Sequence, residues 1–286
     1  MIFQKGGVDT MGKTIKQQKW VLTILLSNIF IAFLGIGLVI PVMPSFMNIM
    51  HLSGKTMGYL VAVFAVAQLL MSPIAGRWVA EISAHTTQTN FVSDLKKSVN
   101  PLYFTAFIIV FVLAFGLSAY ETVFSLFSDH KFGFTPKDIA GIITISSIFG
   151  VVVQVFLFGK MVDLLGEKKL IQICLFSGAI LAVASTMIAS YFAVLAVTCL
   201  IFLAFDLLRP ALTTFLSRAA GKEQGFVAGM NSTYTSLGNI VGPAMGGILF
   251  DVNINYPYLF AAVIMVIGLG ITFVWKEKTL AEGVTE

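Results

Sequence analysis

The chain has 286 residues, of which 57% are apolar and only 11% charged, and its mean hydropathy is +0.92. About a quarter of the residues of an ordinary soluble domain are charged, so this composition excludes that class and indicates a membrane protein. The net charge of +4 is compatible with nucleic acid, but basic excess in membrane proteins collects in cytoplasmic loops, so we expect no nucleic-acid partner.

Eight apolar runs are long enough to cross a bilayer as helices, which takes roughly 17 to 25 residues because every backbone polar group must be satisfied within its helix. The fifth and sixth runs are separated only around Ser190 and Tyr191, so one bent re-entrant element is the alternative to two spans. The runs are 20–42, 57–76, 102–127, 139–159, 170–189, 191–216, 226–249 and 256–275.

These runs predict an all-α, polytopic membrane protein with two helices before a polar segment and six helices after it. The predicted parts are a cytoplasmic N-terminal segment (1–19), a two-helix unit (20–79), a cytoplasmic linker (80–101), a six-helix unit (102–275) and a cytoplasmic tail (276–286).

The distribution of lysine and arginine predicts the orientation of the spans. With the N-terminus in the cytoplasm, 14 of the 18 basic residues fall in cytoplasmic segments, Arg209 lies within a span, and only Lys55, Lys131 and Lys137 fall outside. This asymmetry predicts that both termini are cytoplasmic. The first ten residues lack an apolar core, so we expect no cleavable signal peptide there, and Met11 is an alternative start.

An internal comparison suggests that the first unit is short. A shift of 83 residues pairs Gly76 with Gly159 and Arg77 with Lys160, and this match stops after Val79. The second unit has 174 residues and the first has 60, a difference of 114 residues, or about four helices. The chain is therefore either a parallel repeat with a shortened first half or an unequal architecture of two plus six helices without a repeat. In the shortened form, we expect the first two helices to pack poorly against the rest.

Three charged residues lie within the predicted spans: Glu121, Asp206 and Arg209. A charge near the bilayer centre costs roughly 2.5 to 3.5 kcal/mol, so such side chains usually face a bundle interior or a watery cavity. Phe202, Asp206 and Arg209 recur at helical spacing, which predicts one cavity wall for substrate binding or proton coupling. The alternatives are a permanent structural pair between Asp206 and Arg209, and a position for Glu121 at the wet rim.

The seventh run is rich in glycine and polar residues. Gly238, Gly242 and Gly246 recur every four residues, a spacing that lets helices approach closely, and Pro243 favours a bend, so we predict that these four residues serve helix packing. Asn231 is a candidate for lining the cavity, or it bonds across helices instead.

No catalytic, metal or cofactor motif is present. Cys174 and Cys199 lie in apolar runs without metal-binding or disulfide spacing, and His51, His85 and His130 are far apart in predicted loops. We therefore expect no enzyme, no metal and no cofactor.

Five segments resemble the major facilitator superfamily, and within it the bacterial multidrug (quinolone) efflux drug:proton antiporters of the NorA and Bmr type. They are FLGIGLVIPVMP (Phe33 to Pro44), SPIAGRWV (Ser72 to Val79), GLSAYETVFSLF (Gly116 to Phe127), FDLLRPALTT (Phe205 to Thr214) and NSTYTSLGNIVGP (Asn231 to Pro243).

The resemblance implies a twelve-helix transporter of the bacterial plasma membrane that exports hydrophobic or cationic drugs in exchange for protons. By motif, Glu121 and Asp206 would be its carboxylates, Arg209 would tune or bind, and Phe202 and Asn231 would line the cavity. The sequence departs from the family after Val79, where GRWV runs into a segment similar to the central loop, so helices three to six of the family are expected to be missing. The alternative function is a nontransporting membrane fragment produced by a deletion or gene-model error.

Overall fold

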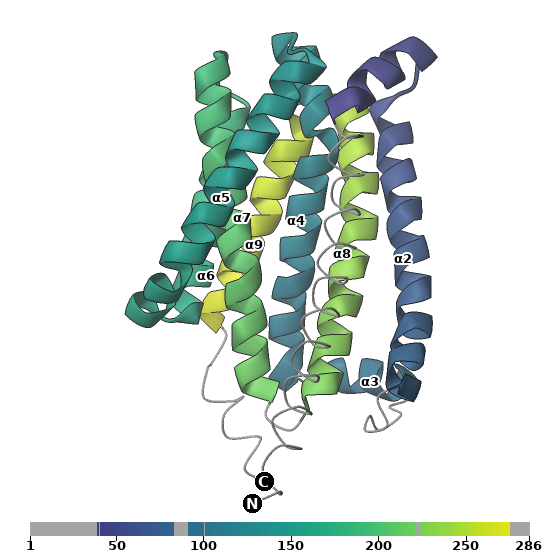
Figure 1. The fold of residues 1–286 in the computed structure, drawn as a ribbon, viewed down its shortest axis with the longest axis vertical. Coiled ribbons are helices and arrows are strands. Elements are labelled where there is room, and N and C mark those ends of the chain that lie inside the picture. The colour runs from purple at the N-terminus through teal and green to yellow at the C-terminus, as the bar shows by residue number, and fades with distance from the viewer. Residues whose placement is uncertain (1–38, 40, 83–90, 100, 221–222, 275–286) are drawn as a thin grey trace, which may run out of the picture.

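The computed structural model describes residues 39, 41–82, 91–99, 101–220 and 223–274. In this part of the chain every regular element is a helix, and the long helices run side by side as one bundle (Figure 1). Residues 41–50 are helical as well. The other helices are α2 (Gly54–Ile82), α3 (Phe91–Ser98), α4 (Pro101–Phe132), α5 (Pro136–Leu165), α6 (Glu167–Ser185), α7 (Tyr191–Ala220), α8 (Gln224–Val252) and α9 (Tyr256–Val274).

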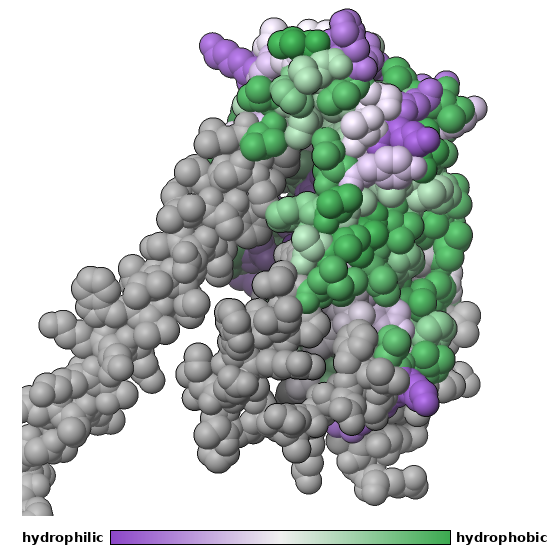
Figure 2. Space-filling model, turned by 90° about the vertical axis from the view of Figure 1, so that its right-hand side faces the viewer, coloured by the Kyte–Doolittle hydropathy of each residue, from purple (hydrophilic) through white to green (hydrophobic). Residues whose placement is uncertain are grey.

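Five helices of the described part are long and apolar enough to cross a membrane, namely α4, α5, α6, α7 and α9. The chain is therefore a multi-pass, all-α membrane protein, and Figure 2 shows an apolar belt between more polar ends. Each of the six predicted C-terminal spans corresponds to one helix. The fifth and sixth are separate, because α6 ends at Ser185 and α7 begins at Tyr191. The predicted span 20–42 lies almost wholly outside the described residues.

Local sequence signals set the connection from α4 to α6. Thr135 and Asp138 form a capping box in which each side chain bonds the other residue's backbone amide, and Pro136 occupies the first turn of α5. Gly166 ends α5 with a φ of 76°, a conformation that favours glycine, and its amide donates to the carbonyl of Val162 at 2.8 Å. Helix α6 starts directly after this glycine.

Helix α4 is the centre of the bundle, between α8 and α9 (Figure 1). A Cβ atom on Gly238 would lie 2.6 Å from Ala114 Cβ, and one on Gly242 would lie 2.7 Å from the Phe115 carbonyl oxygen. The predicted packing glycines of α8 thus face α4, with Gly246 against Ala119. Because they have no side chains, the two backbones approach more closely than larger residues would allow.

The opposite face of α8 holds α2. Gly58 lies against the Pro243 carbonyl and Gly247, while Gly247 also meets the Gly54 carbonyl. The expected poor packing of the first two helices is therefore wrong for α2, because glycines on both helices allow backbone contact. The first helix before residue 41 lies outside the described residues, apart from residue 39.

The predicted linker 80–101 contains the short helix α3, which lies across one end of the bundle near α2 and α8 (Figure 1). Lys97 forms an ion pair with Glu223 and lies 4.8 Å from the ring centre of Phe226, and buried Ser98 is 3.2 Å from the Tyr234 hydroxyl. These contacts join α3 to the first part of α8.

Candidate functional site

Asp206 lies where α7 packs on α5. Asp206 is half-buried, and a Cβ atom on Gly150 would collide with its carboxylate oxygen. Four residues later, Pro210 lacks the amide that would normally bond to the Asp206 carbonyl, so the helix has a weak point at this residue. The sequence thus places a carboxylate, a carbonyl without its usual helical donor and a close helix approach at one position.

Arg209 follows one turn later and is exposed. None of the ion pairs among the described residues joins it to Asp206, although the two charges lie close enough to interact electrostatically. The geometry therefore does not support the permanent structural pair between Asp206 and Arg209. Both groups are available for other partners.

Glu121 projects from α4 toward the same region. Its side chain is accessible to solvent, yet many protein atoms surround it, and it interacts electrostatically with both Arg209 and Asp206. This combination indicates a recessed position within the spanning part of the bundle. The structure therefore brings the three charged residues of the spans into one neighbourhood, built from α4 and α7.

Phe202 and Asn231 differ in their contacts with the three charged residues. Phe202 is half-buried one turn before Asp206, and its ring centre lies 6.2 Å from Tyr120 and 6.4 Å from Phe124. It thus packs on α4 beside Glu121. Asn231 is half-buried on α8, and no hydrogen bond of the described residues joins it to the charged group.

Sequence reasoning missed a set of buried hydroxyls around the charged group. The Tyr120 side chain is buried with its ring centre 5.0 Å from that of Tyr258, and the Tyr258 hydroxyl is buried without a partner in the described part. Ser125 and Ser128 are also buried on α4. Their spacing from Glu121, four and seven residues, is the signal that could have identified them.

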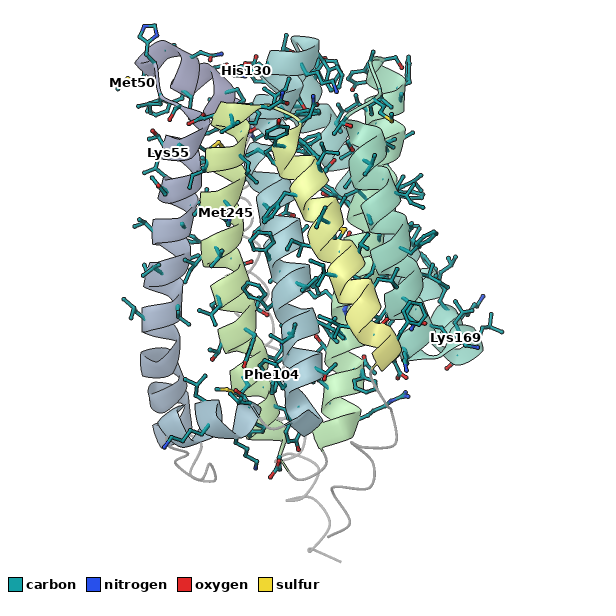
Figure 3. The ribbon with its side chains drawn as sticks, turned by 180° about the vertical axis from the view of Figure 1, so that it is seen from behind. Met50, Lys55, Phe104, His130, Lys169 and Met245 are labelled. Atoms are coloured by element: carbon teal, nitrogen blue, oxygen red, sulfur yellow. The ribbon has the colours of Figure 1, made fainter. Side chains whose placement is uncertain are left out.

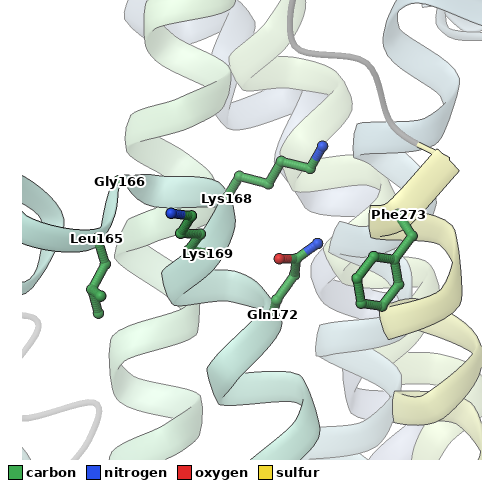
Figure 4. A pocket seen from close by; sticks show the side chains of 6 residues that line it. All are labelled: Leu165, Gly166, Lys168, Lys169, Gln172 and Phe273. Carbon is green, nitrogen blue, oxygen red and sulfur yellow. The ribbon is translucent and has the colours of Figure 1, made fainter.

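The pocket in Figure 4 lies elsewhere, at the turn between α5 and α6. It has a volume of about 420 Å³, and none of the predicted site residues lines it. Its lining residues are Leu165, Gly166, Lys168, Lys169, Gln172 and Phe273. Within the described residues, no cluster of histidine, cysteine and acidic side chains could hold a metal ion.

Comparison with known proteins gives matches over nearly the whole chain. The Major Facilitator Superfamily profile matches residues 106–286. Multidrug resistance protein 2 of Bacillus subtilis is 49% identical, with 94% of this chain and 98% of the relative covered. Multidrug resistance protein 1 of the same organism is 36% identical (89% and 96% covered), and the quinolone resistance protein NorA of Staphylococcus aureus is 28% identical (89% and 96% covered).

The length of these matches bears on the missing helices. The alignment with Multidrug resistance protein 2 spans 392 positions, whereas the chain has 286 residues, so at least 106 positions, the difference of the two lengths, have no counterpart here. This agrees with a shortened first half. The names of the relatives favour a transporter over the nontransporting fragment and over an enzyme.

Proposed function

Since the chain belongs to the major facilitator superfamily, we propose that it exports hydrophobic or cationic drugs across the bacterial plasma membrane in exchange for protons. The multidrug and quinolone resistance proteins to which the chain is similar support drugs as its substrates. We further propose that export is coupled to protons through Glu121 and Asp206 and that both termini lie in the cytoplasm.

The recessed position of Glu121 carries the proposal. A carboxylate in a spanning helix is costly unless it meets a cation or a proton, and this one is accessible. A bulky cationic drug would bind by ion pairing with Glu121 or Asp206 and by contact with Phe202. A proton on the same carboxylate removes the charge that holds the cation, so drug and proton compete for one group.

Arg209 supports the same reading. It lies within electrostatic range of both carboxylates and forms an ion pair with neither. When a cation arrives, Arg209 can turn away from the carboxylates. The guanidinium thus adjusts how readily the carboxylates take up a proton.

The test is export of a fluorescent cationic dye from cells that express this chain alone, with and without an uncoupler. We expect uncoupler-sensitive export that is lost in Glu121→Gln and in Asp206→Asn while membrane insertion remains normal. Asp163→Asn is the matched control, since Asp163 is an exposed carboxylate on α5. Absence of export by the normally inserted parent chain would contradict the proposal and favour the nontransporting fragment.

A further inference from the structure

Two serines continue the line of Glu121 along α4 toward one end of the bundle. Residues four and seven positions apart lie on one face of a helix, so Glu121, Ser125 and Ser128 form a single stripe. Ser125 and Ser128 are each 0% exposed, and neither hydroxyl has a hydrogen-bond partner within the described part of the chain. By contrast, the Ser118 hydroxyl on the same helix donates to the Ala114 carbonyl at 2.8 Å.

The stripe has an accessible group at each end. At one end is the Glu121 carboxylate. At the other, Asp129 follows Ser125 by four residues on nearly the same face, its side chain is 28% exposed, and Figure 3 shows its neighbour His130 at the end of the bundle. Asn48 donates to the Asp129 carboxylate at 3.1 Å, so the helix of residues 41–50 contacts this end.

The distances between neighbouring side chains of the stripe are compatible with bridging water molecules. With a rise of 1.5 Å per residue, Ser125 lies about 6 Å from Glu121 along the helix axis and Ser128 about 4.5 Å further on. These steps exceed a direct hydrogen bond, and one water molecule between neighbouring oxygens would bridge each of them.

A packing role alone does not account for the two hydroxyls. A buried hydroxyl without a partner destabilises a fold, whereas alanine would occupy nearly the same space without that cost. Serine in a helix can bond to the carbonyl four residues before it, as Ser118 does, and neither Ser125 nor Ser128 does so. Their free bonding capacity therefore points to a ligand that donates and accepts hydrogen bonds.

We propose that Ser125 and Ser128 bind water and conduct protons between the outer solution and Glu121. In each step an oxygen accepts one proton and releases its other proton to the next oxygen, so no serine or water ends with a changed charge. The last transfer converts the Glu121 carboxylate to the acid. The groups facing Glu121 are Arg209 and Asp206 from α7, and those at the outer end are Asp129 and His130. The use of this path in drug export rests on the proposed function, but the path itself is measurable without export.

The experiment follows protonation of Glu121 directly. The purified full chain is reconstituted in liposomes with a strongly buffered interior, the outer solution is acidified rapidly, and time-resolved infrared spectroscopy records the protonated carboxyl band. Glu121→Gln identifies the band by its loss. Ser118→Ala is the matched control, since it removes a satisfied hydroxyl from the same helix.

We expect the double variant S125A/S128A to slow protonation at least about tenfold, since positioned proton-transfer groups contribute factors of about 10² to 10⁴. Ser118→Ala should keep the parent rate, and S125T/S128T, which retains both hydroxyls, should restore it. The unfolding temperature of the double alanine variant should equal or exceed that of the parent. An unchanged protonation rate in S125A/S128A, or equal slowing in Ser118→Ala, would overturn the proposal.

The two proposals fail separately. If Glu121 takes up protons through the serines but dye export is unchanged in Glu121→Gln, the proposed drug:proton exchange is wrong, whereas the proposed proton path is supported. If proton-driven export persists at the parent rate in S125A/S128A, the proposed proton path through the serines is wrong, whereas the drug:proton exchange is supported.

Discussion

The carboxylate of Asp251, at the end of α8, accepts a hydrogen bond from the amide of Gly54, the first residue of α2, at 2.7 Å. Its second oxygen accepts from the amide of Lys55 at 3.0 Å. The first amides of a helix have no partner within the helix and carry partial positive charge, so this carboxylate satisfies two of them. It fixes one end of α2 on the six-helix unit.

Replacing Asp251 with alanine should loosen α2. Loss of a capping side chain costs about 1 kcal/mol of stability, so we expect a lower unfolding temperature for Asp251→Ala and a smaller decrease for Asp251→Asn. Unfolding of the purified chain can be followed by the reaction of buried Cys174 with a thiol-reactive dye. Asp163→Ala, at an exposed position on α5, should leave the unfolding temperature unchanged, and an equal decrease there would contradict the capping role.

The contact of α8 with α4 should tolerate no side chain at Gly242. An added Cβ would lie against the Ser118 hydroxyl and 2.7 Å from the Phe115 carbonyl oxygen, so Gly242→Ala should destabilise by about 1 to 3 kcal/mol. Gly229→Ala on the same helix is the matched control, because its Cβ would have no neighbour within 4 Å. That substitution should be neutral or stabilising, since alanine favours helix more than glycine does by about 1 kcal/mol. Similar thermal stability of the two variants would contradict the close contact.

Gly150 should control the position of the Asp206 carboxylate. A methyl group at residue 150 would collide with the Asp206 carboxylate and push it out of the α5 and α7 contact. We expect Gly150→Ala to reduce dye export strongly in a protein that still inserts, whereas Gly159→Ala, on the same helix with no neighbour within 4 Å, should export normally. Normal export by Gly150→Ala would show that this position of Asp206 is not needed.

The helices were predictable because long apolar runs in a membrane can satisfy their backbone groups only as helices. The glycine spacing of α8 likewise indicated a packing face before its partner α4 was known. The proximity of Glu121 to Asp206 was not predictable by the same means, because it depends on how α4 and α7 are rotated against each other, which tertiary contacts decide.

The packing of α2 and the position of α3 could not be predicted without knowing which helix each one contacts. The close packing of α2 depends on Gly58 meeting Pro243 and Gly247, and a glycine within one helix does not reveal which helix it meets. Helix α3 was missed because it is short and only three of its eight residues are apolar, and because its position depends on Glu223, far away in the sequence.

The ion pair between Lys97 and Glu223 predicts a dependence of stability on pH. The Lys97 ammonium and the Tyr103 hydroxyl, which donates at 2.8 Å, hold the pKa of Glu223 below its usual value of 4.5. Because the folded state favours the ionised form, the stabilisation is fully present above pH 4.5 and is lost as the pH falls from there through the lower folded pKa. Both side chains are more than a third exposed, so the effect should be at most about 1 kcal/mol.

The measurement compares the unfolding temperatures of the parent and Glu223→Gln across this pH range. The parent should be the more stable above pH 4.5, and the difference should shrink as the solution becomes more acidic. High salt should reduce the difference as well, since exposed charges are screened. A difference that stays constant through acidification would mean that Glu223 stabilises the protein through packing rather than through its charge.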